Sequence, residues 1–448
     1  MPTQHQVTSK QIFTTWWPLA ASWFLMALEL PALSAIVARL PDPKINLAAY
    51  GGIVFPLALI IEAPIIMLLA ASTALSKDWN SYRKIRKFMH TISAMLTGMH
   101  ILVVVTPLYS FVVEKLIGSP AEIIAPARIG LAIMLPWTWA VGYRRFNQGV
   151  LIRFGHSVTV GKGTFLRLSA NIFVLTIGYL IGTIPGIVVA TAAVATGVVS
   201  EALYVGIKVR PVLEDQLKPL PELKPELSKK AFLQYYIPLA LTSLITLLSQ
   251  PLISSALSRM PRALDSLAVW PVLSGFLFML RSVGVAYNEV VVTLIGKPNS
   301  YSNLRKFALF LVSLTSGLLL LITITPLSTV WFKYISALPT SLLALANTAL
   351  WFSLLIPGAN ALQSWYQGIL LHSGRTRGIP EAVAIFLGVT ITTYLIGISQ
   401  ETMPGLYIGT LGLSLGMAFQ AGWLKIRSQK AVNLIKIKDH SPDLGLQD

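Results

Sequence analysis

The chain has 448 residues, of which 54% are hydrophobic and 12% are charged, and its mean hydropathy is +0.68. A soluble domain carries about 25% charged residues, so this composition excludes a soluble globular protein and indicates a membrane protein. The absence of cysteine excludes disulfides, thiol catalysis and thiolate metal sites. A net charge of +17 would suggest nucleic acid as the partner of a soluble protein, but its distribution here favours a topology signal.

Twelve apolar stretches are long enough to cross a bilayer, which takes about 20 helical residues. In the first half they lie near 11–39, 47–75, 88–113, 123–150, 160–184 and 186–208. In the second half they lie near 231–259, 266–295, 307–332, 338–371, 379–399 and 403–424. The predicted fold is therefore an all-α polytopic membrane protein with 12 transmembrane helices.

The two halves are copies of one unit at an offset of 219 to 220 residues. Pro31 returns as Pro251, the segment Arg86-Lys87-Phe88 returns as 305–307, and Gln148-Gly149 returns as 367–368. Six spans per copy is an even number, so both copies enter from the same side, which predicts a parallel repeat of two six-helix lobes.

Lys77 and Lys297 keep the offset of 220, so the one-residue difference is expected in the loop that follows them. With that alignment Glu62 matches Ser282, and Arg281 matches Ile61.

The basic residues fall mostly on one side of this map. That side holds 27 Lys and Arg, and the other side holds seven. This excess predicts that both termini are cytoplasmic, and the expected location is the bacterial inner (plasma) membrane. The predicted domains are an N-lobe at 1–209, a proline-rich cytoplasmic linker at 210–230, a C-lobe at 231–427, and a polar cytoplasmic tail at 428–448 with little fixed structure.

Charged residues inside the spans are the candidate functional groups, because each costs roughly 3 kcal/mol at mid-bilayer on insertion scales. Glu29 lies two residues before Pro31, which cannot donate an N–H to the carbonyl of Ala27 and so permits a helix kink. Pro251 is the matching kink position in the second half. Glu29 is either a proton-carrying carboxylate or a neutral group bonded to a neighbouring helix.

Glu62 and Arg281 lie at nearly the same place in each half, with opposite charges. We expect them to line a cleft between the lobes, where they would meet and separate; the alternative is a static ion pair. Arg281 and Asn288 share one helical face with Gly284, and Glu289 lies toward that side. This polar stripe favours either an anion contact or a helix–helix contact.

Two further charged features receive structural interpretations. Glu201, near the end of the sixth span, is expected to reach water or Lys208. The basic segment 143–149, with Arg144 and Arg145, is expected to anchor the chain at the bilayer surface. The six histidines are too scattered to suggest a metal site, and no catalytic residue or cofactor is expected.

The two parallel lobes, their proline-bearing first helices and the Gln-Gly pair after the fourth span resemble the multidrug/oligosaccharidyl-lipid/polysaccharide transporter superfamily, in particular MATE-type exporters. Pro18-Leu19, Leu47-Ala48 with Tyr50-Gly51, Ala63-Pro64 and 238–241 are similar to the progressive ankylosis protein family. The resemblance implies a V-shaped transporter with a central cleft. An aspartate typical of proton-coupled MATE exporters would fall near Leu33, where this chain has none.

The resulting hypothesis is a secondary active exporter of a small organic solute that works by alternating access of its two lobes. The resemblance to the progressive ankylosis family, together with Arg281, favours an anion as that solute. Glu29 and Glu62 would be proton or cation sites, so coupling to H+ or Na+ is left open. A lipid-linked substrate flippase and a non-transporting membrane scaffold are the alternatives. The expected partners are the bilayer and the solute, without nucleic acid, and a monomer is expected.

Overall fold

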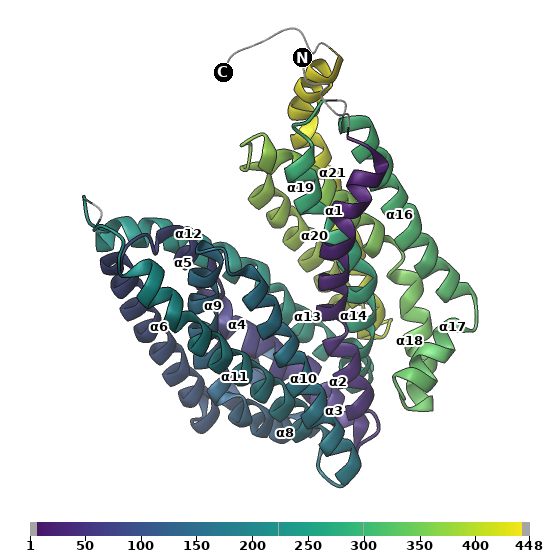
Figure 1. Cartoon of the computed structure of the whole chain (residues 1–448). Helices are drawn as coiled ribbons and strands as arrows, with labels where there is room; N and C mark the ends of the chain where they lie inside the picture. The colour runs from purple at the N-terminus through teal and green to yellow at the C-terminus, as the bar shows by residue number, and fades with distance from the viewer. Residues whose placement is uncertain (1–6, 223, 299, 441–448) are drawn as a thin grey trace. The chain divides into compact units, whose positions relative to one another are not determined.

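The computed structural model describes residues 7–222, 224–298 and 300–440, and within these ranges the chain is helical with no strand (Figure 1). The helices of the first half are α1 Ser9–Ala27, α2 Glu29–Val37, α3 Pro43–Ala49, α4 Phe55–Ile66, α5 Leu68–Leu75, α6 Trp79–Val105, α7 Leu108–Ser110, α8 Ala121–Ile133, α9 Leu135–Arg153, α10 Ser157–Ile181 and α11 Gly186–Val212. Those of the second half are α12 Lys229–Leu247, α13 Ser249–Ser258, α14 Ala263–Val285, α15 Tyr287–Leu294, α16 Ser300–Ile324, α17 Leu327–Thr329, α18 Thr340–Phe352, α19 Leu355–His372, α20 Gly378–Gln400 and α21 Gly405–His440. Four π-helical segments lie at Tyr50–Val54, Phe111–Ile117, Leu213–Leu217 and Val330–Ile335.

Nine helical segments of the described chain are long and apolar enough to cross a membrane, and eleven are if each of two bent pairs counts as one span. The bent pairs are α8 with α9, at 45°, and α18 with α19, at 41°. The chain is thus an integral membrane protein, although twelve spans are not confirmed. The twelfth predicted span, 403–424, falls in α21, which is helical but is not among these segments.

The backbone repeats as the sequence does. Left-handed residues occur in pairs at the repeat offset: Asp42 with Arg262, Gly118 with Ala337, Gly155 with Gly374, and Gly182 with Glu401. Their φ angles lie between 48° and 81°, a region that most side chains avoid. In two of these pairs, the glycine of the first half is replaced by alanine or glutamate in the second. The left-handed turn is therefore retained even where glycine, the residue that favours it, is not.

The structure corrects the position of the one-residue difference between the copies. Met67, after α4, and Ala286, after α14, both mark helix breaks, and they are separated by 219 residues. Likewise, a Cβ at Gly149 would approach the Leu69 carbonyl, and one at Gly368 would approach that of Asn288.

The extra residue is therefore absorbed earlier, in the π-helical segment Tyr50–Val54, whose counterpart in α14 is α-helical. A π-turn closes hydrogen bonds one residue further along and so accommodates an insertion without ending the helix. The expected match of Glu62 with Ser282 is consequently wrong in the structure. Glu62 and Arg281 occupy the same repeat position.

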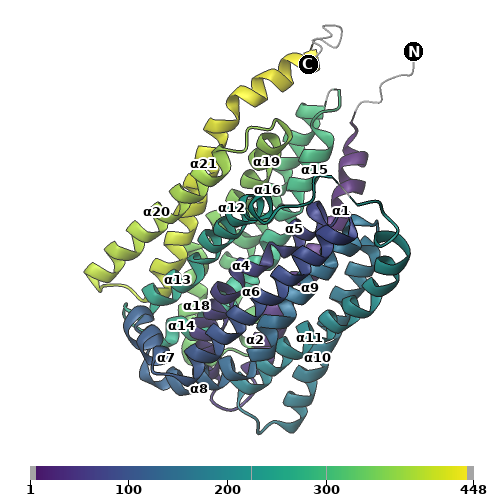
Figure 2. The same ribbon diagram turned by 90° about the vertical axis from the view of Figure 1, so that its left-hand side faces the viewer.

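By its contacts the chain divides into two compact units. The first unit contains Leu33–Arg259 and Ala263–Ala268, and the second contains Met1–Ala32, Met260–Arg262 and Val269–Asp448. The units differ from the predicted lobes because the copies exchange their first helices. Helix α1 packs on α15 and α16, whereas α12 packs on α4 (Figure 2).

Equivalent aromatic residues make the two exchanged contacts. Trp16 of α1 donates from Nε1 to the Val283 carbonyl at 2.9 Å, and its ring lies 5.4 Å from that of Phe307. Tyr236 of α12 donates to the Pro64 carbonyl, and its ring lies 5.0 Å from that of Phe88. An aromatic ring with one polar atom suits a buried helix contact next to a free carbonyl.

Both first helices break at the same place. The segment α1–α2 is interrupted at Leu28, three residues before Pro31, and α12–α13 is interrupted at Leu248, three residues before Pro251. Each proline lacks the N–H that would bond the carbonyl four residues back. The same interruption before a proline thus occurs in both copies.

The predicted tail differs from the structure over 428–440, where α21 continues as a helix. Ala431 is buried in the second unit, and Val432 and Ile435 pack against the same core, which also contains Trp365. This apolar face, at helical spacing, stabilises the extension. Residues 441–448 lie outside the described residues.

Candidate functional site

Glu201 of α11 is the centre of a buried polar network in the first unit. Its carboxylate accepts hydrogen bonds from Arg144 Nη1 at 2.6 Å and Gln148 Nε2 at 2.9 Å, both from α9, and from Thr164 Oγ1 of α10 at 3.3 Å. Arg167 Nε of α10 lies 3.4 Å from the same carboxylate, whose side chain is 0% exposed. A buried carboxylate requires this degree of pairing.

This network lies well inside its helices. Arg144 is nine residues before the end of α9, and Arg167 is ten residues after the start of α10. At 1.5 Å per residue, they lie roughly 14 Å and 15 Å from those helix ends. The interpretation of Arg144 as a surface anchor, and of Glu201 as a group reaching water or Lys208, is therefore wrong.

The repeat shows which part of the network is structural. Gln363 and Gln420 occupy the positions of Arg144 and Glu201 in the second half, and Gln363 Nε2 donates to Gln420 Oε1 at 3.0 Å. The contact between α9 and α11 thus has a counterpart between α19 and α21, where a neutral amide pair replaces the ion pair. Arg144–Glu201 is a charged version of a packing contact, so its charges are not needed for the fold itself.

Glu62 and Arg145 belong to the same cluster but remain without direct partners. Glu62, on α4, is 7% exposed, and the cations that act on it electrostatically are Arg145, Arg144 and Arg167. Neither Glu62 nor Arg145 makes a hydrogen bond or ion pair with any residue that the structure describes. Three arginines face two glutamates, so the cluster carries one excess positive charge in a low-dielectric region.

Arg281 has a different environment in the second unit. It lies near the end of α14, its Nε is buried, and it makes no hydrogen bond or ion pair within the described ranges. The second-half counterparts of Arg144, Arg145 and Arg167 are Gln363, Ser364 and Phe386. These three positions therefore carry no charge in the unit that contains Arg281. A charge of this kind inside a membrane helix is costly unless an anion or water satisfies it.

The predicted stripe beside Arg281 separates into two environments. Asn288 Nδ2 donates to the Ser364 carbonyl at 3.3 Å, which places it in the contact between α15 and α19. Gly284, near the end of α14, also lies against α19, since a Cβ there would be 3.2 Å from Asn360 Oδ1. That Oδ1 is buried without a hydrogen bond to the described residues. Glu289 is exposed and does not share this contact.

Glu29 begins α2, immediately after the break at Leu28, and is half-buried in the second unit. Pro31, also in this unit, approaches α14, because a Cβ at Gly275 would lie 3.1 Å from Pro31 Cδ. Glu29 and Arg281 thus belong to one unit, whereas Glu62 belongs to the other. A pairing of Glu62 with Arg281 stays a prediction.

Sequence reasoning missed the Glu201 network, although the signal was present. Arg144, Arg167 and Glu201 each fall six or seven residues from the same-side end of a predicted span, in three successive spans. Successive spans are antiparallel, so equal distances from alternate ends place these charges at one depth. Opposite charges at one depth on neighbouring helices predict a buried ion pair.

Comparisons with known proteins give the same fold throughout the chain. The chain is similar to an inward-facing multidrug resistance MATE family transporter of the MOP superfamily, with TM-score 0.68, 15% identity, and coverage of 93% of this chain and 96% of that one. It is similar to the lipid II flippase MurJ in an inward closed conformation, with TM-score 0.68, 14% identity, and 96% and 94% coverage. A MOP superfamily transporter from Pyrococcus furiosus matches with TM-score 0.59, 16% identity, and 96% and 97% coverage.

No protein-family model matches the sequence, and no curated protein matches it. The structural likenesses nevertheless establish the architecture: this chain has the fold shared by MATE-type transporters and the MurJ flippase. The resemblance to the wider superfamily therefore agrees with the structure.

Proposed function

We propose that the chain is a secondary active transporter that moves a small organic anion across the membrane by alternating access. One observation carries this proposal. The same repeat position holds a buried carboxylate, Glu62, in one copy and a half-buried arginine with a buried Nε, Arg281, in the other, and neither has an ion-pair partner among the described residues. Such groups are costly in a membrane and mark solute or ion pathways.

Arg281 is the proposed anion contact. Its guanidinium carries five N–H donors in a planar fork, which suits a carboxylate or phosphate group. An anion would satisfy the buried Nε and neutralise a charge that no side chain described in the structure balances. Asn288, on the following helix, keeps α15 against α19 in this proposal and positions the end of α14.

Glu62 is the proposed coupling group, with Arg145 as its electrostatic partner. Binding of a proton or Na+ at Glu62 would raise the positive charge of the cluster, so ion binding and anion binding would depend on one another. Glu29 is a second coupling candidate because it lies at the hinge.

Flux into proteoliposomes tests the proposal with labelled succinate, citrate and glycerol 3-phosphate, under an imposed pH or Na+ gradient. At least one anion should exchange in the wild type. Arg281→Gln should lower kcat/KM for that anion by at least tenfold, which corresponds to a loss of about 1.4 kcal/mol of binding free energy. Glu62→Gln should keep anion exchange but lose the response to the gradient, and Glu29→Gln tests the same response at the hinge.

The matched control is the double variant Arg144→Gln with Glu201→Gln, which copies the amide pair of the second half. It should fold and should still exchange the anion. Transport of neutral or cationic probes with no exchange of any anion would contradict the proposal.

A lipid-linked substrate is the second candidate, favoured by the MurJ flippase, whose TM-score of 0.68 equals that of the inward-facing MATE transporter. Scrambling of a fluorescent polyprenyl-phosphate lipid between leaflets, with no exchange of the soluble anions, would select this candidate.

A further inference from the structure

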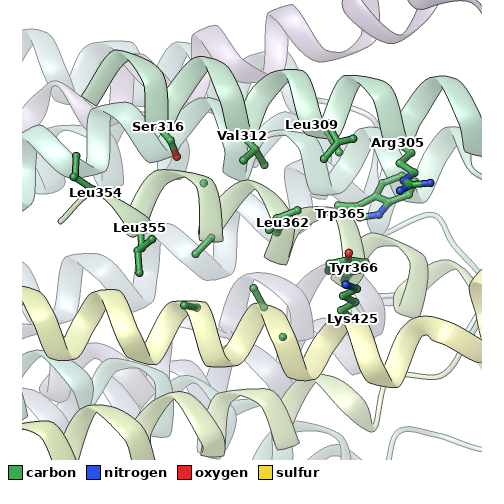
Figure 3. Close-up of a pocket in the computed structure, with 16 residues that line it drawn as sticks. Arg305, Leu309, Val312, Ser316, Leu354, Leu355, Leu362, Trp365, Tyr366 and Lys425 are labelled. Carbon is green, nitrogen blue, oxygen red and sulfur yellow. The ribbon is translucent and has the colours of Figure 1, made fainter. Parts of the chain in front are cut away.

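A groove of about 640 Å³ lies in the second unit between α16, α19 and α21 (Figure 3). Along most of its length its walls are apolar, with Val312 from α16, Leu355 and Leu362 from α19, and Ala418 from α21. Leu309 and Leu355 at its edge are 49% and 53% exposed. In a membrane protein these exposed edges face lipid, so the groove is open to the hydrocarbon region.

The groove has the length of one leaflet. It runs along α16 from Arg305 to Ser316, eleven residues apart, which corresponds to roughly 16 Å of helix. The hydrocarbon core is about 30 Å thick, so this is about half of it. Small residues on α21, Ala421 and Gly422 among them, leave the space unfilled. One acyl chain fits this shape.

One end of the groove is basic and aromatic. Arg305, Trp365, Tyr366 and Lys425 gather there, at the opposite end from Leu354 and Ser316 (Figure 3). A second pocket of about 310 Å³ shares these four residues and continues past them.

The second pocket adds a third cation and further polar groups. Lys436 Nζ lies 5.3 Å from the centre of the Tyr301 ring, and both residues line this pocket. No acidic side chain is among the described residues that line either pocket. Three cations with Trp and Tyr at a helix end are typical of a lipid headgroup region.

We propose that this groove binds an anionic phospholipid, with one acyl chain between α16, α19 and α21 and its phosphate among Arg305, Lys425 and Lys436. The apolar length of the groove and its open edge favour a lipid over a free anion, and the basic end favours an anionic headgroup over a zwitterionic one. The bound lipid is not the transported solute. Because Lys436 lies on the extension of α21, the lipid also links this extension to α16.

Native mass spectrometry of the full chain tests the site by titrating phosphatidylglycerol against phosphatidylcholine. The wild type should retain phosphatidylglycerol preferentially. Removing two headgroup cations, Arg305→Gln with Lys425→Gln, should weaken its binding by roughly 30-fold. The matched control is Arg375→Gln with Arg377→Gln, which removes the same charge from a different surface pocket and should leave binding unchanged.

A second variant fills the groove and keeps every cation. Gly422→Leu is suited to this purpose because a Cβ at Gly422 has no heavy atom within 4 Å, so the side chain enters open space. It should also weaken phosphatidylglycerol binding at least tenfold. Thermal unfolding and size-exclusion chromatography verify that each variant folds.

Three results would overturn the proposal. The first is equal retention of phosphatidylglycerol and phosphatidylcholine by the wild type. The second is displacement by inorganic phosphate together with unchanged binding in Gly422→Leu, which would assign the basic end to a free anion. The third is an equal loss in Arg375→Gln with Arg377→Gln, which would reduce the effect to overall charge.

Discussion

Glu201 shows how a buried charge can be structural in a membrane protein. Its carboxylate accepts bonds from Arg144 and Gln148 at 2.6 and 2.9 Å, and the copy of this contact in the second half is the pair Gln363–Gln420. Breaking a buried ion pair by removing one partner leaves an uncompensated charge, whereas replacing both partners with a matched neutral pair does not.

We therefore expect Glu201→Gln alone to destabilise the protein by about 3 to 5 kcal/mol, because Arg144 stays buried and charged. Adding Arg144→Gln should restore part of this loss, since the amide pair of the second half is recreated while Arg167 still loses its carboxylate partner. Thermal or denaturant unfolding of the single and double variants in detergent measures the cycle. Additive losses would contradict the structural role assigned to this pair.

The residues that we propose to carry function make no such matched pair. Glu62, Arg145 and Arg281 have no ion-pair partner among the described residues. The sequence alone predicted Glu62 and Arg281, because charges inside apolar stretches are conspicuous. It did not predict Arg145, because a basic residue near a predicted span end is usually a surface anchor, and the depth of the side chain depends on where α9 ends.

At the scale of elements, both first helices are interrupted three residues before a proline at one repeat position, at Leu28 and Leu248, and we propose that these interruptions act as hinges. In this proposal the two parts of a first helix change their angle as access alternates. Pro18 provides a contrast, because it lies within α1 and the helix continues through it.

Replacing Pro31 by Ala restores the N–H that bonds the Ala27 carbonyl, so α1 and α2 should become more continuous. The expected result is a gain in unfolding free energy of up to about 3 kcal/mol and a turnover lower by severalfold at unchanged KM. Anion exchange and thermal unfolding measure both effects. Equal turnover in Pro31→Ala and the wild type, or equal slowing in the control Pro18→Ala, would show that the break is not a working hinge.

The π-helical segment Tyr50–Val54 explains why the alignment from sequence was displaced by one residue after it. Identities such as Lys77 with Lys297 suggested an insertion in a loop, where insertions are usually tolerated. Only backbone hydrogen bonding shows that a helix absorbed the extra residue, and this moves Glu62 onto the position of Arg281.

At the scale of the whole molecule, each unit is completed by the first helix of the other copy. The sequence predicted the duplication, the helical fold and most span positions, because hydrophobic length and repeated motifs report them directly. It did not predict the exchange of α1 and α12, since adjacent helices in sequence are normally neighbours in space. One sign of the exchange is visible in the sequence. Phe88 and Phe307 occupy the same repeat position, and each packs against an aromatic residue of the exchanged helix.

A double-mutant cycle tests the exchange. Trp16→Ala and Phe307→Ala remove the two rings that lie 5.4 Å apart, and their effects on unfolding free energy should be coupled by about 0.5 to 1.5 kcal/mol. The control combines Trp16→Ala with Phe352→Ala, whose ring stacks on Tyr407 instead, and should be additive within about 0.5 kcal/mol. Additivity between Trp16 and Phe307 would contradict the assignment of α1 to the second unit.

The central claim is that Arg281 contacts a transported anion. It is tested most directly by anion exchange in proteoliposomes, comparing Arg281→Gln with the charge-neutral double variant Arg144→Gln and Glu201→Gln. Both proteins lose an arginine charge from within a helix, but only the first loses the proposed anion contact. The account predicts at least a tenfold loss of kcat/KM in Arg281→Gln, with exchange retained in the double variant. Undiminished anion exchange by folded Arg281→Gln would contradict it.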